Sequence, residues 1–223
     1  MSETAATTTK SLIRRALPSP VVYLIQMFRR LAPASRRVFA RNWLQRLFTR
    51  TSALPEGMPA VPRVLFVCHG NILRSAVAQA MYADRVRLGQ APAGSSAESA
   101  GTAAREGDPA DPRGIGVARD LGIRLDGHRA GRLNEQLITR ADLILVMDYL
   151  NEADVLARFP AAAGKVRLLG SFLAANGRAA EIHDPYTGSA DDVRASFHVI
   201  AKAVDSLAAS LSLAGTREAG NSA

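Results

Sequence analysis

The chain has 223 residues, of which 48% are hydrophobic, enough for one domain with a real core. Its single cysteine excludes an intramolecular disulfide, a zinc site built on cysteines and an iron–sulfur cluster, and we expect neither a metal nor a cofactor. Residues 1–55 contain ten Lys or Arg and one acid, whereas the remainder contains eighteen Lys or Arg and nineteen acids, so the net charge of +8 belongs to the N-terminal segment and nucleic-acid binding is not expected.

Residues 1–55 are predicted to be a basic extension ahead of the main domain. Its apolar run VVYLIQMF (21–28) is shorter than the roughly 20 residues that span a bilayer. From Pro33 to Arg50, apolar side chains recur at helical spacing with arginines between them, which predicts a basic amphipathic helix. The apolar set consists of Phe39, Trp43, Leu44, Leu47 and Phe48.

The extension has three possible functions. An Arg-rich helix with Trp and Phe suits an anionic membrane surface, which would hold residues 10–52 at the inner face of a membrane. The helix could instead dock on a partner or on the protein's own domain. Its Arg-rich, acid-poor composition is also typical of a cleaved targeting sequence. Prolines and a glycine follow at 51–62, and within them residues 56–62 are expected to be a linker.

From residue 63 to 213 the chain alternates predicted strands and helices. Short apolar runs and their flanking residues predict strands at 64–67, 95–99, 141–148 and 165–170. Helical patterns predict helices at 75–89, 111–122, 149–159 and 190–212. This alternation predicts an α/β fold, a three-layer sandwich around a four-stranded parallel sheet. Residues 214–223 are expected to be a disordered tail.

The cysteine lies in the stretch VLFVCHGNILRSA (64–76). Cys68 falls between the predicted first strand and the next helix, at the edge where α/β sheets bind ligands. Backbone N–H groups and a helix N-terminus favour an anion there, and they favour thiolate over thiol. Gly70 and Asn71 tolerate a left-handed backbone, and Arg74 offers a planar fork that matches a phosphate. Taken alone, Cys68 could equally be a buried structural thiol.

Seven motifs in one order point to a known family. They are CHGNILRS (68–75), ESAGT (98–102), DPADPRG (108–114), GHRAGRL (127–133), ADLILVMD (141–148), KVRLLGSF (165–172) and HDPYTG (183–188). With them the chain resembles the low-molecular-weight protein tyrosine phosphatases over about residues 62–212. The resemblance implies hydrolysis of phosphotyrosine through a cysteinyl-phosphate intermediate.

The resemblance also implies catalytic roles. Cys68 would be the nucleophile, and Asp184 the acid that protonates the leaving phenolate and then the base that activates water. Arg74 would bind the phosphate oxygens together with the loop amides. The other residues expected to line the substrate site in this loop are His69, Gly70, Asn71, Ile72, Leu73 and Ser75.

Other residues would support the reaction. Ser75 would donate its hydroxyl to the sulfur, and Asn71 would fix the shape of the loop. Ser99 and His128 would hold that loop from behind. Tyr186 would form one wall of the entrance by stacking on an aryl ring.

The sequence departs from the family pattern around the loop and the entrance. Leu73 stands where members commonly have a second cysteine, so Cys68 cannot form a protective disulfide. His69 replaces an apolar residue, and either adds positive charge when protonated or points outward. Arg105 and Glu106 occupy a region where many eukaryotic relatives have an aromatic residue, which makes Arg105 a candidate for binding acidic substrates.

The substrate is predicted to be phosphotyrosine, with phosphoarginine as the alternative. Related bacterial phosphoarginine hydrolases tend to carry Thr where this loop has Ile72, whose apolar side chain suits an aryl ring. Arsenate reductases share the loop but need further cysteines or an external thiol. A phosphate-binding module docked on a membrane partner, without activity, is the competing class.

The resemblance also suggests where the enzyme works and on what. Relatives of this bacterial type often act opposite membrane-bound tyrosine autokinases that control export of surface polysaccharide. We therefore expect a cytoplasmic enzyme whose partner is a phosphotyrosine protein, with such a kinase as a candidate. A basic extension at the membrane would raise its effective concentration near that kinase.

Overall fold

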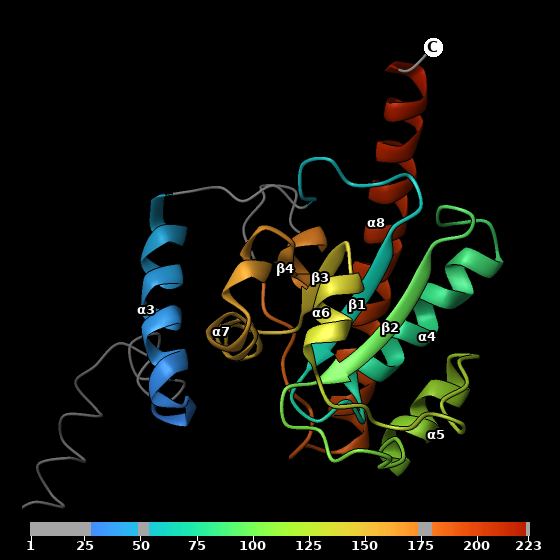
Figure 1. Ribbon diagram of the computed structural model, residues 1–223. Coiled ribbons are helices and arrows are strands. Elements are labelled where there is room, and N and C mark those ends of the chain that lie inside the picture. The colour runs from blue at the N-terminus through green and yellow to red at the C-terminus, as the bar shows by residue number, and fades with distance from the viewer. Residues whose placement is uncertain (1–27, 49–53, 174–179, 222–223) are drawn as a thin grey trace, which may run out of the picture.

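The structure is a computed structural model that describes residues 28–48, 54–173 and 180–221. The sequence predictions for residues 1–27 therefore lie outside the described residues. The described chain begins with a short helical turn at 28–30 and helix α3 (Pro33–Phe48), which belongs to the N-terminal extension. From Arg63 on, the residues that the structure describes form one α/β unit built on a single sheet (Figure 1).

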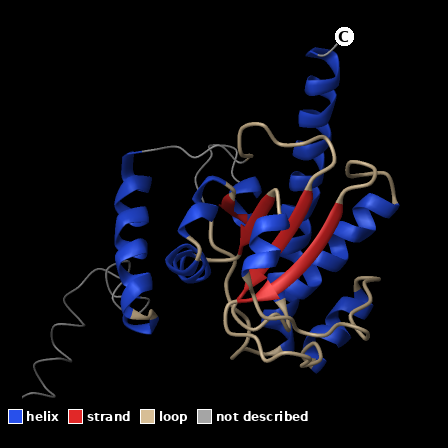
Figure 2. Ribbon diagram, in the orientation of Figure 1, coloured by secondary structure: helices blue, strands red, loops and turns tan. Residues whose placement is uncertain are grey.

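The sheet has four parallel strands, as predicted. They are β1 (Arg63–Cys68), β2 (Ser96–Gly101), β3 (Leu143–Val146) and β4 (Val166–Leu168). Their order is β2-β1-β3-β4, and every pairing is parallel (Figure 2). Strand β2 thus lies on one side of β1, and β3 and β4 lie on the other, so the strand order reverses at β1. Ligands of open α/β sheets bind at the carboxyl end of such a strand.

Helices cover both faces of the sheet (Figure 1). Helices α4 (Arg74–Arg87), α5 (Pro112–Asp120) and α8 (Ala190–Asn221) pack on one face. Helices α6 (Glu135–Arg140) and α7 (Tyr149–Arg158) pack on the other. Two 3-10 helices flank β4, η1 (Pro160–Gly164) and η2 (Leu169–Leu173). The three-layer sandwich predicted from the sequence is therefore confirmed.

The residues of β1 explain why both faces need cover. Val64 and Phe66 enter the core with α4 and α8, whereas Leu65 and Val67 enter the core with α6 and α7. Alternate side chains of a strand point to opposite faces, so a strand that is apolar at every position must be buried on both.

Helix α8 is both longer and more central than predicted. It continues to Asn221, where a disordered tail from residue 214 was expected, and that expectation is wrong through residue 221. The sequence after residue 213 contains no proline, and a Cβ added at Gly215 would lie 3.7 Å from Ala60 Cα, so this part of the helix still packs on the segment before β1. Among the described residues α8 is the one helix long and apolar enough to cross a membrane, but its apolar stripe lies in the core. The stripe consists of Val193, Phe197, Ile200, Val204, Leu207 and Leu211.

The segment expected to be a linker packs on the domain. Met58 is 6% exposed and belongs to the core cluster beneath α4 and α8, and Leu54 packs against the same cluster. Residues 56–62 therefore form a fixed connection rather than a free spacer. The sequence did not predict this packing, because Pro and Gly indicate a turn but do not indicate whether an apolar residue between them is buried.

Helix α3 docks on the protein's own domain, one of the three functions left open. It lies alongside α7, where Leu31 and Phe39 pack against Ala153 (Figure 1). Asn42 Nδ2 donates a 3.2 Å hydrogen bond to Glu152 Oε2 in the same interface. The docking face thus takes Phe39 from the predicted stripe and adds residues outside it.

The predicted apolar stripe of α3 instead divides between two faces of the helix. Phe39 is 6% exposed, whereas Trp43 and Leu44 are 36% and 53% exposed. Ser35 is buried with Phe39, so the inward face follows an i, i+4 spacing that begins with a polar residue. Because this inward face begins with the polar Ser35, the apolar pattern of the sequence did not predict it.

Candidate active site

The phosphate-binding loop, residues 68–75, joins the end of β1 to the start of α4. Asn71 has a φ of 55°, a left-handed conformation, while Gly70 is not among the residues with positive φ, so the predicted curl rests on Asn71 alone. The loop folds back against β2 at Gly101, where a Cβ would stand 2.6 Å from the carbonyl oxygen of His69 and 3.0 Å from Asn71 N. Only glycine permits that approach.

Hydrogen-bond donors point at the buried sulfur of Cys68. The backbone N–H of Asn71 donates to Sγ over 3.3 Å, and Ser75 Oγ lies 3.0 Å from Sγ. Asn71 Nδ2 donates to Ser75 Oγ at 2.8 Å, which leaves the hydroxyl hydrogen of Ser75 free to point at the sulfur. These donors and the N-terminal end of α4 therefore meet at the sulfur.

Asn71 is the hub that fixes the loop. Its amide nitrogen also donates to Ser99 Oγ at 2.9 Å, and its amide oxygen accepts from Gly131 N at 2.8 Å. Ser99 Oγ donates in turn to Gln79 Oε1 at 2.5 Å, and His128 Nε2 lies 2.6 Å from the carbonyl oxygen of Asn71. The sequence predicted Ser99 and His128 in this position, and the structure brings both of them to the loop.

The surroundings of His128 keep its ring neutral. Burial lowers its pKa, Arg129 acts in the same direction, and the hydrogen bond to Asn71 opposes them without reversing the net lowering. A neutral ring that bonds a carbonyl oxygen must carry its hydrogen on Nε2. The histidine therefore acts as a donor to the loop at neutral pH.

Arg74 is buried to 2% exposure between two carboxylates. Its Nη1 donates to Asp148 Oδ2 at 2.7 Å and to the carbonyl oxygen of Ile182 at 3.0 Å, and its Nη2 lies 2.7 Å from Asp184 Oδ2. Burial alone would lower its pKa, but Asp148, the Cys68 sulfur and Asp184 raise it above the ordinary value. These contacts use three of the five guanidinium donors, so two are left for an anion.

Asp184 lies at the surface beside Arg74. Its side chain is 45% exposed, and Oδ1 accepts a 3.3 Å hydrogen bond from Tyr186 N. Tyr186 is 57% exposed, as a side chain at an entrance must be. The fold thus brings the Cys68 loop and the HDPYTG segment together through Arg74, across more than one hundred residues of sequence.

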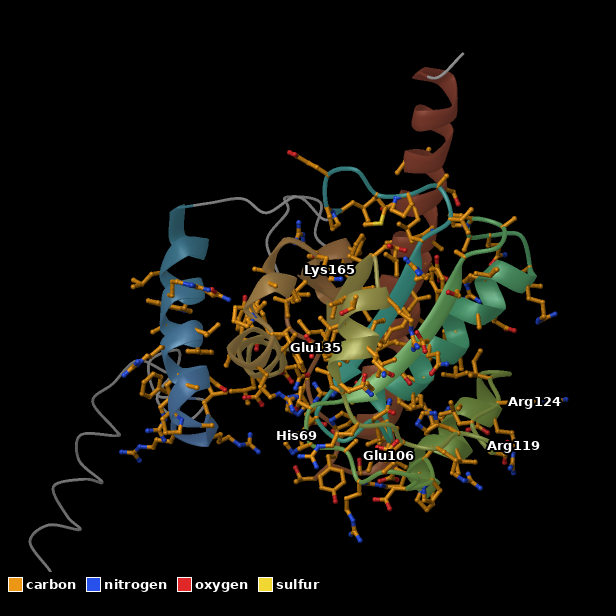
Figure 3. All side chains as sticks on the ribbon, viewed as in Figure 1. His69, Glu106, Arg119, Arg124, Glu135 and Lys165 are labelled. Carbon is orange, nitrogen blue, oxygen red and sulfur yellow. The ribbon has the colours of Figure 1, made fainter. Side chains whose placement is uncertain are left out.

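Three predicted substrate residues are located differently from the rest. Leu73 is 3% exposed and faces Gly114, where a Cβ would be 2.7 Å from Leu73 Cδ2, so only its backbone can line the site. His69 is exposed and lies at the same end of the molecule as Glu106 (Figure 3), which agrees with the outward-pointing alternative. The Arg105 side chain is 88% exposed and 3.8 Å from Asp108.

Asp148 ends the motif ADLILVMD (141–148), but the sequence did not predict a role for it. Its Oδ1 caps α7 by accepting from Asn151 N at 2.7 Å, while Oδ2 binds Arg74. The available signal was position, because an acid that ends a buried strand next to β1 must lie at the same sheet edge as Cys68. Gln79 and Gly131 carried no comparable signal, since a helix glutamine and a loop glycine are common everywhere.

The described residues contain no group of three or more His, Cys, Asp or Glu placed to hold a metal ion. The site instead collects donors, a sulfur and two carboxylates around one arginine. Such a set can hold a tetrahedral anion against the sulfur and supply a proton from Asp184.

Comparison with known proteins identifies the arrangement. The model of the low molecular weight phosphotyrosine protein phosphatase family matches residues 63–216. A probable low molecular weight protein-tyrosine-phosphatase, EpsP of Ralstonia nicotianae, is 38% identical over 145 residues, 65% of this chain and 92% of the relative. Low molecular weight protein-tyrosine phosphatase A of Mycobacterium tuberculosis is 38% identical over 149 residues, 65% of this chain and 88% of the relative.

Solved structures agree. The arginine phosphatase YwlE of Geobacillus stearothermophilus superposes with a TM-score of 0.63 and 31% identity, covering 70% of this chain and 96% of that one. The tyrosine phosphatase Wzb of Escherichia coli K30 superposes with a TM-score of 0.60 and 30% identity, covering 68% and 99%. The chain belongs to the low-molecular-weight phosphotyrosine protein phosphatase family.

Proposed function

We propose that this protein hydrolyses phosphotyrosine in proteins through a cysteinyl-phosphate intermediate. The observation that carries the proposal is the convergence at one sheet edge of the Cys68 sulfur, a backbone amide 3.3 Å from it, and the buried Arg74 paired with Asp184. Each group has one task in phosphoryl transfer, and none depends on a cofactor.

In the first step the Cys68 thiolate attacks phosphorus while the P–O bond to the phenol breaks. Arg74 and the loop amides bind the equatorial oxygens, whose charge grows in the transition state. Asp184 gives its proton to the leaving phenolate, which would otherwise depart as a strong base. The products of this step are the free phenol, a cysteinyl phosphate and an Asp184 carboxylate.

In the second step a water molecule attacks the cysteinyl phosphate. The Asp184 carboxylate takes one proton from that water, and the S–P bond breaks to release phosphate. Ser75, whose Oγ lies 3.0 Å from Sγ, donates a hydrogen bond to the departing thiolate and keeps its proton. The sulfur and the carboxyl group are thereby returned to their starting states.

Two side chains favour an aryl substrate. Ile72 presents an apolar, half-buried side chain in the loop, and Tyr186 presents an exposed ring for stacking. Phosphoarginine is the second candidate, because YwlE of Geobacillus stearothermophilus, an arginine phosphatase, has a similar fold. An apolar side chain at position 72 offers no hydrogen bond to a guanidinium group, and for this reason we favour phosphotyrosine.

The test is phosphate release from a phosphotyrosine peptide and a phosphoarginine peptide of otherwise identical sequence. We expect wild type to prefer phosphotyrosine, Cys68→Ser to be inactive and Asp184→Asn to lose about 100-fold or more, the usual contribution of proton transfer. Asp126→Asn, an exposed acid paired with Arg119, is the matched control. A preference for phosphoarginine would keep the chemistry and change the substrate, whereas no release from either peptide would leave only a phosphate-binding module.

We propose further that the outward face of α3 binds an anionic membrane surface, where a tyrosine autokinase would be a substrate. Arg37, Arg41, Trp43 and Leu44 are exposed on the helix that Phe39 anchors to the domain. Exposed basic and aromatic side chains on one helix suit the membrane interface. The enzyme would then act in the cytoplasm, peripherally at the inner face of the membrane.

Vesicle sedimentation tests this location. The full chain should sediment with anionic vesicles at low salt and be released by added salt, while neutral vesicles should leave it in solution. Arg37→Ala combined with Arg41→Ala should weaken the sedimentation. Equal behaviour with the two kinds of vesicle would remove the membrane from the proposal.

Arg105 is proposed to favour acidic peptides. Its exposed guanidinium group is on the loop that follows β2 and is free to reach a substrate carboxylate, with Asp108 3.8 Å away as a weak competitor. Arg105→Ala should lower kcat/KM a few-fold for an acidic phosphopeptide and leave p-nitrophenyl phosphate nearly unchanged, as expected for one exposed charge pair. Equal losses on the two substrates would remove the selectivity.

A further inference from the structure

The first turn of α5 carries an arginine to which the proposed reaction gives no role. The Arg113 side chain is 33% exposed and binds the carboxylate of Asp111, the N-cap residue of the same helix. Nε lies 2.9 Å from Asp111 Oδ1, and Nη2 lies 2.6 Å from Asp111 Oδ2. Such a two-point contact holds the plane of the guanidinium group in one orientation.

The other edge of the same guanidinium group holds the segment that carries Asp184. Arg113 Nη1 donates to the carbonyl oxygen of Gly188 at 2.5 Å, and Nη2 donates to the carbonyl oxygen of Tyr186 at 2.9 Å. These carbonyls are two and four residues beyond Asp184, in the acid loop, residues 182–189. One planar group therefore fixes two points of the acid loop.

The start of α5 is also attached to the phosphate-binding loop. Asp111 N donates to the carbonyl oxygen of Ile72 at 3.0 Å, and Gly114 lies directly against Leu73. The two loops that must meet in the reaction thus share one support, with Arg113 as its link to the acid loop. The pair stays ionised over a wide range, because their mutual hydrogen bond lowers the pKa of Asp111 and raises that of Arg113.

Other contacts hold the two ends of the acid loop. Ile182 N donates to the carbonyl oxygen of Met147, the carbonyl oxygen of His183 accepts from Ser196 Oγ at 3.3 Å, and Ser189 bonds Asp192. Among the described residues the Asp184 carboxylate itself is bound by Arg74 and by Tyr186 N, and the contact with Arg74 must change when a phosphate group occupies the same guanidinium. The backbone contacts with Arg113 do not involve the phosphate site, so they persist when substrate binds. They are therefore suited to keep Asp184 in reach of the leaving oxygen.

We propose that Arg113 is a positioning residue that holds the acid loop so that Asp184 can protonate the leaving group. This inference rests on the proposed role of Asp184 as the general acid. It requires no contact between Arg113 and substrate, and it predicts a specific kinetic signature. Loss of Arg113 should harm only the steps in which Asp184 transfers a proton.

The leaving group provides the test. The phenol of phosphotyrosine has a pKa of about 10 and needs protonation as it leaves, whereas p-nitrophenol is far more acidic and departs without help. A misplaced acid should therefore lower kcat/KM for a phosphotyrosine peptide and spare p-nitrophenyl phosphate. The ratio of the two values does not depend on the fraction of folded enzyme, because both substrates report the same active molecules.

We would measure this ratio for wild type, Arg113→Ala, Asp184→Asn and the double variant, with Arg119→Ala as the control. Arg119 is on the same helix and pairs with the exposed Asp126, away from both loops (Figure 3). Arg113→Ala should lower the ratio by about tenfold to 100-fold, a partial loss of the roughly 100-fold or more that proton transfer contributes, and Arg119→Ala should leave it unchanged. The double variant should show the ratio of Asp184→Asn alone, because Arg113 acts through Asp184.

Several results would overturn the inference. Equal losses on both substrates would make Arg113 a merely structural residue, and so would a double variant whose ratio falls by the product of the single effects. If Asp184→Asn lowers the ratio and Arg113→Ala does not, the positioning role fails while the proposed mechanism stands; if Asp184→Asn leaves the ratio unchanged, both fail. Should Arg113→Ala not fold, Arg113→Lys gives the same readout, since lysine cannot bind a carboxylate and two carbonyls with one planar fork.

Discussion

The phosphate-binding loop and the docked helix α3 lie in the same molecule but are held by different forces. In the loop, Asn71 alone makes hydrogen bonds to Ser75, Ser99, Gly131 and His128, all of them between 2.6 and 2.9 Å. In the α3 interface, Leu31, Phe39 and Ala153 form a small apolar cluster. A dense polar network specifies one geometry, whereas apolar contact tolerates small shifts, so the two regions should respond differently to the same kind of change.

The same substitution, Asn to Ala, can be made in both regions. Asn71→Ala removes three side-chain hydrogen bonds and leaves a left-handed backbone on a residue that disfavours it. We expect kcat/KM to fall about 100-fold, the effect of a misplacement near 1 Å in an active site. Asn42→Ala removes one hydrogen bond to Glu152, and we expect kcat/KM to change less than about twofold because that bond only holds α3.

Steady-state kinetics of the two variants, with circular dichroism to check folding, would make this comparison. Similar losses in both would mean that the position of α3 matters to the loop as much as Asn71 does. The two regions would then differ in the kind of contact that holds them but not in their importance for catalysis.

Helix α7 belongs to both regions, and its N-cap residue offers the next test. Asp148 caps α7 and holds Arg74, while the middle of the helix receives α3. Asp148→Ala would leave a buried guanidinium group with one partner fewer, at a cost of roughly 3 kcal/mol in the free energy of unfolding. Urea denaturation should show that loss, and kcat/KM should fall because Arg74 then has room to turn away from the loop.

Asp148→Asn is the companion variant. The amide keeps the shape and one hydrogen bond but removes the charge, so it should recover part of the stability. If both variants are as stable as wild type, the pairing of Arg74 with Asp148 adds nothing to the fold, and the loop depends less on charge than its contacts suggest.

A pH titration separates the regions further, because the His128 ring bonds the carbonyl oxygen of Asn71 in the phosphate-binding loop. Burial lowers the pKa of His128 in the folded protein, so the unfolded chain binds the proton more readily. The stability contributed by the neutral ring is complete above the unfolded pKa of about 6.5 and is lost as the pH falls through the lower folded value. Urea midpoints between pH 7.5 and 5 should fall for wild type, and His128→Gln should flatten that part of the curve.

The same comparison explains what could be predicted from the sequence. The strands and the Cys68 loop follow from short-range patterns, because an apolar run that ends at a cysteine, an asparagine and an arginine carries its own signal. The roles of Asp148 and Arg113 do not follow from such patterns. Each residue acts on a partner that is more than 70 residues away in the sequence and that only the folded chain brings near. The motifs that contain these two residues can be recognised in the sequence, but the contacts that define their roles cannot.

The docking of α3 could not be predicted for a different reason. Its apolar pattern predicted one stripe that begins at Phe39 and includes Trp43 and Leu44. The face that packs instead combines Phe39 with Ser35 and Asn42. A helix in contact with one neighbouring helix needs only a narrow apolar contact, which a sequence pattern does not distinguish from an exposed stripe. The extended helical end of α8 was missed similarly, because Gly215 and Gly220 are typical helix stop signals and the sequence there has no strong apolar repeat.

The smallest expected effect on catalysis is that of undocking α3. Phe39→Ala removes the large side chain of its cluster, so α3 should separate from α7 and become more sensitive to limited proteolysis, while Trp43→Ala, on an exposed position of the same helix, should not. Because the loop keeps its own hydrogen bonds, kcat should stay within about twofold of wild type, a change below 0.5 kcal/mol in activation free energy. A large fall in kcat with α3 released would mean that α7 transmits its position to Asp148 and Arg74, and the extension would then control the active site rather than only locate it.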